Sequence, residues 1–147
     1  MTLWFDDLTV GRSWNSSTRT VTEADVGDFA TGDRNPLHTS AEYATRTVFG
    51  TRIADGLLGL TLAHGLMWTL TGEPDDSIPA FLGVKDWQFV GPIHFKDTVR
   101  AEYAVVAQRP STTKAARGVV EFAVTVLNYD AVVQKGVQAM LIVKENQ

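Results

Sequence analysis

The sequence predicts an α+β fold in which one long central helix is wrapped by a curved antiparallel β-sheet. Residues 56–70 are apolar, with leucines on every side, which is typical of a helix buried over most of its surface. The second half of the chain carries four segments rich in Val, Phe, Tyr and Ala with short turns between them, which indicates consecutive antiparallel strands. The 147 residues contain no internal repeat or long linker, so residues 1–147 are predicted to form a single domain.

The first helix is predicted to follow a short extended segment at residues 13–21. Thr22 followed by Asp25 is typical of an N-cap with an acidic first turn. The helix is expected to run to about Ala30. Gly32 is expected to close it in a left-handed conformation, which glycine adopts without strain.

A second short helix is predicted after a loop. Thr39 or Ser40 is expected to cap it, with Glu42 suitably spaced for a capping box on Thr39, and the helix is expected to reach about Arg46. The residues between the two helices, GDRNPLH at 32–38, are therefore predicted to be an irregular connection.

The central helix and the strands follow. Asp55 stands immediately before the apolar stretch and is a suitable N-cap for it. Between residues 98 and 108 apolar residues alternate with charged ones, as in a half-buried strand. Strands are predicted at residues 80–91, 98–108, 117–128 and 135–144.

The stretch GDRNPLH contains a carboxylate and an imidazole that neither regular structure would bring together. On a helix Asp33 and His38 would lie about 140° apart, and on a strand they would face opposite sides. Asn35-Pro36 makes the backbone between them irregular, since proline fixes its own φ and moves the preceding residue out of the α region. The stretch therefore predicts a shaped loop in which the two side chains can converge.

Composition and charge argue against several classes of partner. The net charge of −4 leaves no basic stripe for a phosphate backbone, so no nucleic acid is expected as a partner. The longest apolar stretch is too short to span a bilayer and the first residues do not resemble a secretory signal, so no membrane association is expected. The absence of cysteine removes disulfides and thiolate chemistry, and a cytoplasmic location is the expectation.

Two stretches resemble a known family. TGDRNPLHTSAEYATRTVFGTRIADGLLGL, residues 31–60, resembles the Gly-Asp-x-Asn-Pro-Leu-His motif and the Phe-Gly-x-x-Ile-Ala-x-Gly motif of the MaoC-like dehydratases, which include the R-specific enoyl-CoA hydratases. FVGPIHFKDTV, residues 89–99, is similar to the strand and turn that follow in that family. The order of the elements extends the resemblance over nearly the whole chain.

This resemblance implies a hot-dog fold and a lyase that adds water reversibly and syn across the double bond of a trans-2-enoyl-CoA, giving (R)-3-hydroxyacyl-CoA. It implies that Asp33 and His38 are the catalytic pair that holds the water, and that the backbone N–H of Gly56 contacts the thioester carbonyl. Asn35 would stabilise the loop or orient the pair. The resemblance also implies a homodimer or dimer of dimers that takes a small-molecule acyl-CoA thioester. No metal or redox cofactor is expected, and coenzyme A is part of the substrate.

Two positions depart from the family pattern. Asp55 stands where relatives have histidine before the glycine, and Lys96 replaces the turn glycine before Asp97. Asp55 puts a negative charge beside the expected carbonyl site, where it is also expected to contact substrate. As an N-cap it can instead satisfy free backbone donors. Fine substrate specificity is therefore left open.

The residue types suit the implied chemistry. Hydration needs a base that takes a proton from water and an acid that delivers one to C2, and an imidazole can do either near neutral pH while a carboxylate orients or deprotonates the water. The charge that develops on the thioester oxygen needs donors already in place, which the first turn of a helix supplies. Leu60, His64 and Met67 share a helix face with Gly56, and this face is expected to border the acyl group.

Two other functions stay open. A hot-dog acyl-CoA thioesterase would attack the carbonyl carbon and release free coenzyme A. A non-catalytic acyl-CoA binding subunit would bind without turnover, and the intact Asp33/His38 pair argues against it. His64 is expected to be a core or interface histidine rather than a catalytic one, and His94 is expected to be structural or solvent-facing. The three histidines lack the spacing of metal ligands, so no metal site is expected.

Overall fold

The strands form a six-stranded antiparallel sheet in the computed structural model, which describes residues 2–69 and 77–145. The strand order is β1-β4-β5-β6-β3, and β2 pairs with β4 beside β1. The bounds are Ser13–Asn15 for β1, Arg19–Thr20 for β2, Ala80–Phe89 for β3, Thr98–Pro110 for β4, Arg117–Asn128 for β5 and Ala131–Val143 for β6.

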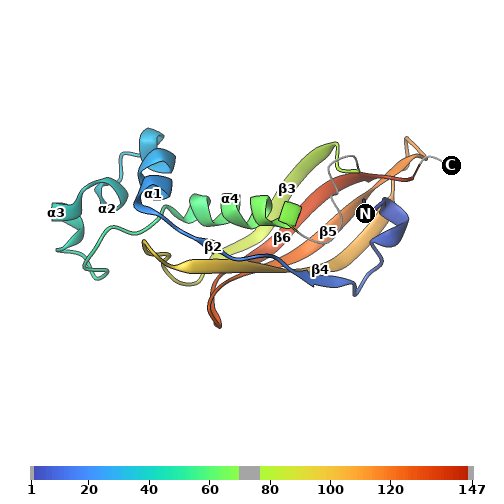
Figure 1. The fold of residues 1–147 in the computed structure, drawn as a ribbon. Coiled ribbons are helices and arrows are strands. Elements are labelled where there is room, and N and C mark those ends of the chain that lie inside the picture. The colour runs from blue at the N-terminus through green and yellow to red at the C-terminus, as the bar shows by residue number, and fades with distance from the viewer. Residues whose placement is uncertain (1, 70–76, 146–147) are drawn as a thin grey trace.

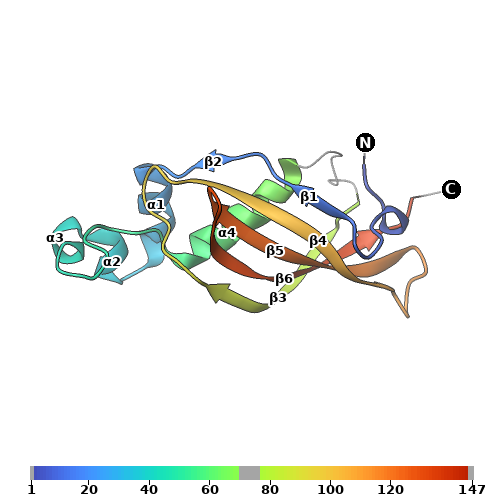
Figure 2. The same cartoon turned by 90° about the horizontal axis from the view of Figure 1, so that it is seen from below.

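The longest helix, α4, lies against the sheet, and three short helices gather beyond its N-terminal end (Figures 1 and 2). This helix wrapped by a curved sheet is a hot-dog fold, which confirms the predicted fold class. No helix in the described part of the chain is long and apolar enough to cross a bilayer. The helices are α1 at Glu23–Phe29, α2 at Pro36–Thr39, α3 at Ala41–Ala44 and α4 at Gly56–Leu66, with 3₁₀ turns at Phe5–Asp7, Ala30–Gly32 and Met67–Thr69.

The core lies between α4 and the inner face of the sheet. Buried and partly buried residues alternate along β4 and β5, so one face of each strand packs into the core. The hydroxyl of Tyr103 on β4 donates a hydrogen bond to the carbonyl of Ala63 on α4. Burial raises the pKa of Tyr103, so the hydroxyl keeps its proton and remains a donor. This bond helps to hold the helix in register with the sheet.

The N-cap predicted for α1 is confirmed. Asp25 N–H donates to Thr22 Oγ1 over 3.0 Å, and Thr22 N–H donates to Asp25 Oδ2 over 2.9 Å, which is a reciprocal capping box. The left-handed closure predicted at Gly32 is wrong. The chain tightens into a 3₁₀ turn from Ala30, which Asp33 N–H closes onto Ala30 O over 2.9 Å, so no reversal of φ is needed.

Replacing Asp25 by alanine is expected to lower the free energy of unfolding by about 0.5–1 kcal/mol at neutral pH, because the N-terminus of α1 loses a carboxylate. The backbone N–H of Thr22 lowers the pKa of Asp25 below its ordinary 3.8, and Arg19 adds to this. The carboxylate's contribution is therefore fully present above pH 3.8 and is lost as the pH falls through the lower folded-state pKa. Urea denaturation of both proteins at neutral and acid pH should show the difference shrinking in acid. A difference that does not change with pH would contradict this account.

The second predicted helix corresponds to α3, which is shorter than predicted and lacks the capping box predicted between Glu42 and Thr39. Ser40 caps α3 through Tyr43 N–H, which confirms one of the two caps considered, but the helix ends at Ala44. Glu42 does not reach back to Thr39 and instead forms an ion pair with Arg46 over 2.7 Å. Glu42 thus pairs with Arg46 four residues ahead, and this ion pair takes the side chain that the predicted capping box on Thr39 would have used.

The backbone conformation of Lys96 is one that favours glycine at this position. Lys96 has φ of 69°, in the left-handed region that glycine adopts without strain. Its N–H donates to Val21 O over 2.7 Å, and the side chain of Asp97 accepts from His94 N–H over 2.8 Å. These hydrogen bonds hold a turn that the lysine by itself would not favour.

Candidate active site

A cavity of about 450 Å³ opens at the N-terminal end of α4. Its walls come from α2, the segment before α4, the first turn of α4, the end of β3 and β6. The lining includes both apolar and polar side chains, among them His38, Asp55, Gly56, Phe89 and Gln134.

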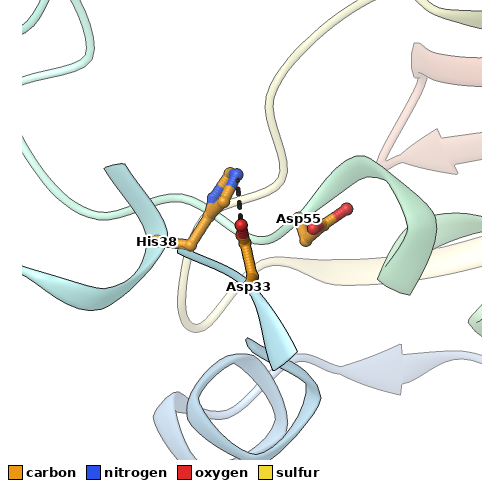
Figure 3. Close-up of side chains that lie close together, drawn as sticks. All are labelled: Asp33, His38 and Asp55. Atoms are coloured by element: carbon orange, nitrogen blue, oxygen red, sulfur yellow. Dashed lines mark ion pairs between the residues drawn. The ribbon is translucent and has the colours of Figure 1, made fainter. Parts of the chain in front are cut away.

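Asp33 and His38 converge, as the sequence predicted, and of the two only His38 is among the residues that line the cavity. Asp33 Oδ2 lies 3.7 Å from His38 Nε2, and the two side chains point toward one another (Figure 3). The stretch between them is not wholly irregular, however, because Pro36–Thr39 forms the short helix α2. Proline is favoured at the first helical position, and Asn35 caps the helix by accepting from Leu37 N–H over 3.0 Å. Asp33 stays extended before that cap, which lets it turn toward a side chain five positions ahead.

The orientation of the His38 ring is fixed by backbone that is remote in sequence. His38 Nδ1 lies 2.8 Å from the carbonyl oxygen of Ile53. A carbonyl can only accept, so Nδ1 carries the hydrogen and Nε2 of the neutral ring carries a lone pair. Ile53 is held in turn by a β-bridge to His94, and the neighbouring Arg52 pairs with Glu23 of α1.

The free oxygen of Asp33 is an acceptor without a donor. Asp33 Oδ1 accepts from Asn35 N–H over 2.8 Å, whereas Oδ2 is buried with no hydrogen-bond partner among the described residues. The lone pair of His38 Nε2 faces this oxygen, and 3.7 Å is too long for a direct hydrogen bond. Two acceptors at this separation suit a donor placed between them, such as a water molecule or a cation.

Asp55 lies beside this pair and caps α4. Its Oδ1 accepts from Leu57 N–H over 2.8 Å, so the expected N-cap role is confirmed. Ligand atoms of Asp33, His38 and Asp55 lie within 4.8 Å of one another, a set that could hold a metal ion (Figure 3). The spacing of the three histidines alone gave no sign of this mixed set, because its two carboxylates come from separate loops.

Gly56 begins α4 and lines the cavity. A Cβ at this position would lie 2.7 Å from the ring of Phe89, so the glycine allows close approach. Its carbonyl accepts a hydrogen bond from Gln134 Nε2 over 3.0 Å, and Gln134 Oε1 accepts from Trp87 Nε1–H over 3.0 Å. Gln134 was not among the predicted site residues. The available signal was a glutamine directly after the apolar residues 131–133, but Lys135 follows it, so the pattern does not mark it as buried.

Four of the predicted substrate contacts do not line this cavity. They are Asn35, Leu60, His64 and Met67. Met67 is buried in the core, and the ring of His64 lies 4.5 Å from the ring of Phe81 on β3. Asn35 acts as the cap of α2, which accords with the expected stabilising role. Substrate contact by these four residues stays a prediction.

Comparison with known proteins adds family information to this geometry. A family model described as MaoC like domain matches residues 7–127. The chain is 35% identical over 115 residues to the 3-hydroxybutyryl-CoA dehydratase of Methylorubrum extorquens, which is 77% of this chain and 70% of that protein. It is 32% identical over 135 residues to the (R)-specific enoyl-CoA hydratase of Rhodospirillum rubrum, 84% of this chain and 90% of that protein.

The fold is also similar to that of a solved structure over the full length of both proteins. The MaoC-like dehydratase from Rhodospirillum rubrum superposes with a TM-score of 0.86 at 26% sequence identity. The superposition covers 99% of this chain and 99% of that one. The superposed region therefore includes Asp33 and the short helix α2 that carries His38, as well as the sheet and α4.

Proposed function

The chain belongs to the MaoC-like domain family, and on this premise we propose that it adds water reversibly to the trans-2 double bond of an enoyl-CoA, giving (R)-3-hydroxyacyl-CoA. Its named relatives are a dehydratase and a hydratase, which supports the predicted enzyme class, a lyase of the hydratase or dehydratase type. The observation that carries the proposal is the pair of acceptors, Asp33 Oδ2 and His38 Nε2, which lie 3.7 Å apart, with His38 lining the cavity.

The two acceptors match the two O–H bonds of one water molecule. In the proposed reaction the water donates one O–H to Asp33 Oδ2 and the other to His38 Nε2. His38 removes its proton as the water oxygen bonds to C3, and the π electrons of the double bond move onto the thioester oxygen. The resulting imidazolium then returns that proton to C2, which restores the neutral ring. Asp33 orients the nucleophile and stabilises the transient cation.

Addition on one face follows from this arrangement. The oxygen that bonds to C3 and the proton that bonds to C2 both come from the same water on the same side of the substrate. The Nδ1–H bond to Ile53 prevents the ring from turning away during the transfer. Syn addition therefore needs no second proton donor on the opposite face.

The first turn of α4 supplies the other half of the proposed chemistry. Asp55 takes the N–H of Leu57, while the N–H of Gly56 belongs to the first helical residue and has no acceptor within the helix. We assign this N–H to the thioester oxygen, where negative charge develops. A preorganised donor of this kind is worth about 3–4 kcal/mol of transition-state stabilisation. The charge of Asp55 opposes it, in part offset by the positive end of the helix dipole.

The proposal includes no metal and no redox cofactor, because His38 makes both proton transfers and Asp33 orients the water. Coenzyme A enters as part of the substrate. The predicted homodimer is supported by β3, which forms one edge of the sheet and exposes apolar side chains that a second copy would cover. These exposed residues are Phe81, Leu82, Val84 and Phe89. A cytoplasmic location also stays a prediction.

The proposal is tested with purified protein and a panel of trans-2-enoyl-CoA esters that differ in length, branching and an added carboxylate. Loss of the conjugated absorbance with formation of the (R)-3-hydroxyacyl ester is expected, and treatment with a chelator should leave the rate unchanged. Reaction in D₂O should place deuterium at C2 on the face that carries the new hydroxyl. Release of free coenzyme A without loss of the conjugated absorbance would instead indicate a thioesterase, and tight binding without turnover would indicate a binding subunit.

A further inference from the structure

We propose that Gln134 is a positioning residue that holds the first turn of α4 and so aligns the N–H of Gly56 with the substrate carbonyl. This inference rests on the proposed hydratase function. It concerns a residue that touches the backbone of the site and acts through it.

Gln134 uses both ends of its amide. It is 2% exposed on β6, its Oε1 accepts from Trp87 Nε1–H over 3.0 Å, and its Nε2 donates to the carbonyl of Gly56 over 3.0 Å. The indole can only donate and the carbonyl can only accept, so the amide has one satisfactory orientation. A buried amide with both ends bonded is a rigid link from β3 through β6 to the start of α4.

The glycines of α4 leave room for this link. A Cβ at Gly59 would overlap the Gln134 amide, and a Cβ at Gly56 would lie 2.7 Å from the Phe89 ring. Gly56 and Gly59 are three residues apart, so they share one face of the helix. That face is therefore shaped to receive one glutamine amide on β6 and one aromatic ring on β3.

The link matters because Gly56 has little to fix its own backbone. Glycine at the first position of a helix has wide conformational freedom and no side chain to pack. A hydrogen bond to its carbonyl restrains the peptide that follows it and, through the helix, the direction of its N–H. Displacement of a catalytic group by about 1 Å can lower the rate by about 100-fold, so this restraint acts directly on turnover.

Gln138 offers a matched control on the same strand. It is also fully buried, but neither atom of its amide has a hydrogen-bond partner among the described residues. Methionine keeps the unbranched shape of glutamine and removes the amide, so Gln134→Met and Gln138→Met make the same chemical change at two buried positions. Trp87→Phe removes the indole N–H while keeping an aromatic ring beside Gln134.

The kinetic test uses the best enoyl-CoA of the panel for hydration and the saturated ester of equal length for binding. Gln134→Met is expected to lower kcat by about 10- to 100-fold with KM and saturated-ester Kd within about threefold of wild type. Trp87→Phe should lower kcat by less, and Gln138→Met should change neither kcat nor KM. A structural role alone would instead lower the amount of folded enzyme and leave the kcat of the folded fraction unchanged. Equal kcat values for Gln134→Met and wild type would overturn the proposal.

Hydrogen exchange separates this inference from the proposed function. Gln134→Met should speed amide exchange in the first turn of α4, and Gln138→Met should not. If wild type hydrates no enoyl-CoA, the proposed function fails, and faster exchange in Gln134→Met alone would still show that the glutamine holds the helix start. Unchanged exchange in Gln134→Met would overturn the inference even in an active enzyme. Should Gln134→Met fail to fold, Trp87→Phe decides by the same two measurements.

Discussion

Replacing Asp33 by asparagine is expected to lower kcat for hydration by about 10²- to 10⁴-fold without unfolding the protein. Asparagine can keep the hydrogen bond from Asn35 N–H, which now goes to Asp33 Oδ1 over 2.8 Å. The new NH₂ group would stand in place of Oδ2 and face the lone pair of His38 Nε2. A water molecule between them would then meet a donor where it now meets the acceptor Oδ2, and it could no longer donate to both side chains.

Steady-state kinetics and thermal unfolding of Asp33→Asn test this expectation. Asp97→Asn is a suitable control, because Asp97 also lies 3.7 Å from a histidine, but that histidine, His94, does not line the cavity as His38 does. The control should hydrate at nearly the wild-type rate. If Asp33→Asn kept more than about a tenth of the wild-type kcat, Asp33 could not have the role assigned to it, which is to orient the water and stabilise the imidazolium.

The parts of the fold that were predicted correctly depend on local signals. Thr22 and Asp25 form a capping box within four residues, and Asp55 caps α4 by bonding the N–H two residues ahead. Alternation along β4 and β5 depends only on which face of each strand is buried. Such features need no knowledge of distant segments, so the sequence alone indicates them.

The errors arose where local signals compete or where distant segments meet. Gly32 could end a helix in a left-handed conformation, but the chain continues into a 3₁₀ turn that positions Asp33. Pro36 was interpreted as a breaker between two helices, whereas it starts a helix of its own. The approach of Asp55 to Asp33 and His38 and the link from Gln134 to Gly56 join segments far apart in sequence, and no periodicity indicates such contacts.

His38→Asn should abolish most turnover while preserving stability, with a fall in kcat of about 10²- to 10⁴-fold. The asparagine amide reaches the position of Nδ1 and can still donate to the carbonyl of Ile53, but it has no atom at the position of Nε2. His38→Gln makes the complementary change, with an amide near Nε2 and no donor to Ile53. It should be equally inactive and less stable by about 1–3 kcal/mol, because a buried carbonyl loses its hydrogen bond.

Kinetics and urea denaturation of the two variants therefore distinguish the contribution of Nε2 to turnover from the contribution of Nδ1 to stability. His94→Asn, which alters a histidine that does not line the cavity, should leave kcat near that of wild type. Because Asp33 and His38 are proposed to hold a single water, the loss in kcat from Asp33→Asn and His38→Asn together should be close to that of either alone. Losses that multiply in the double variant would mean that the two side chains act in separate steps, and a shared water could not then be the nucleophile.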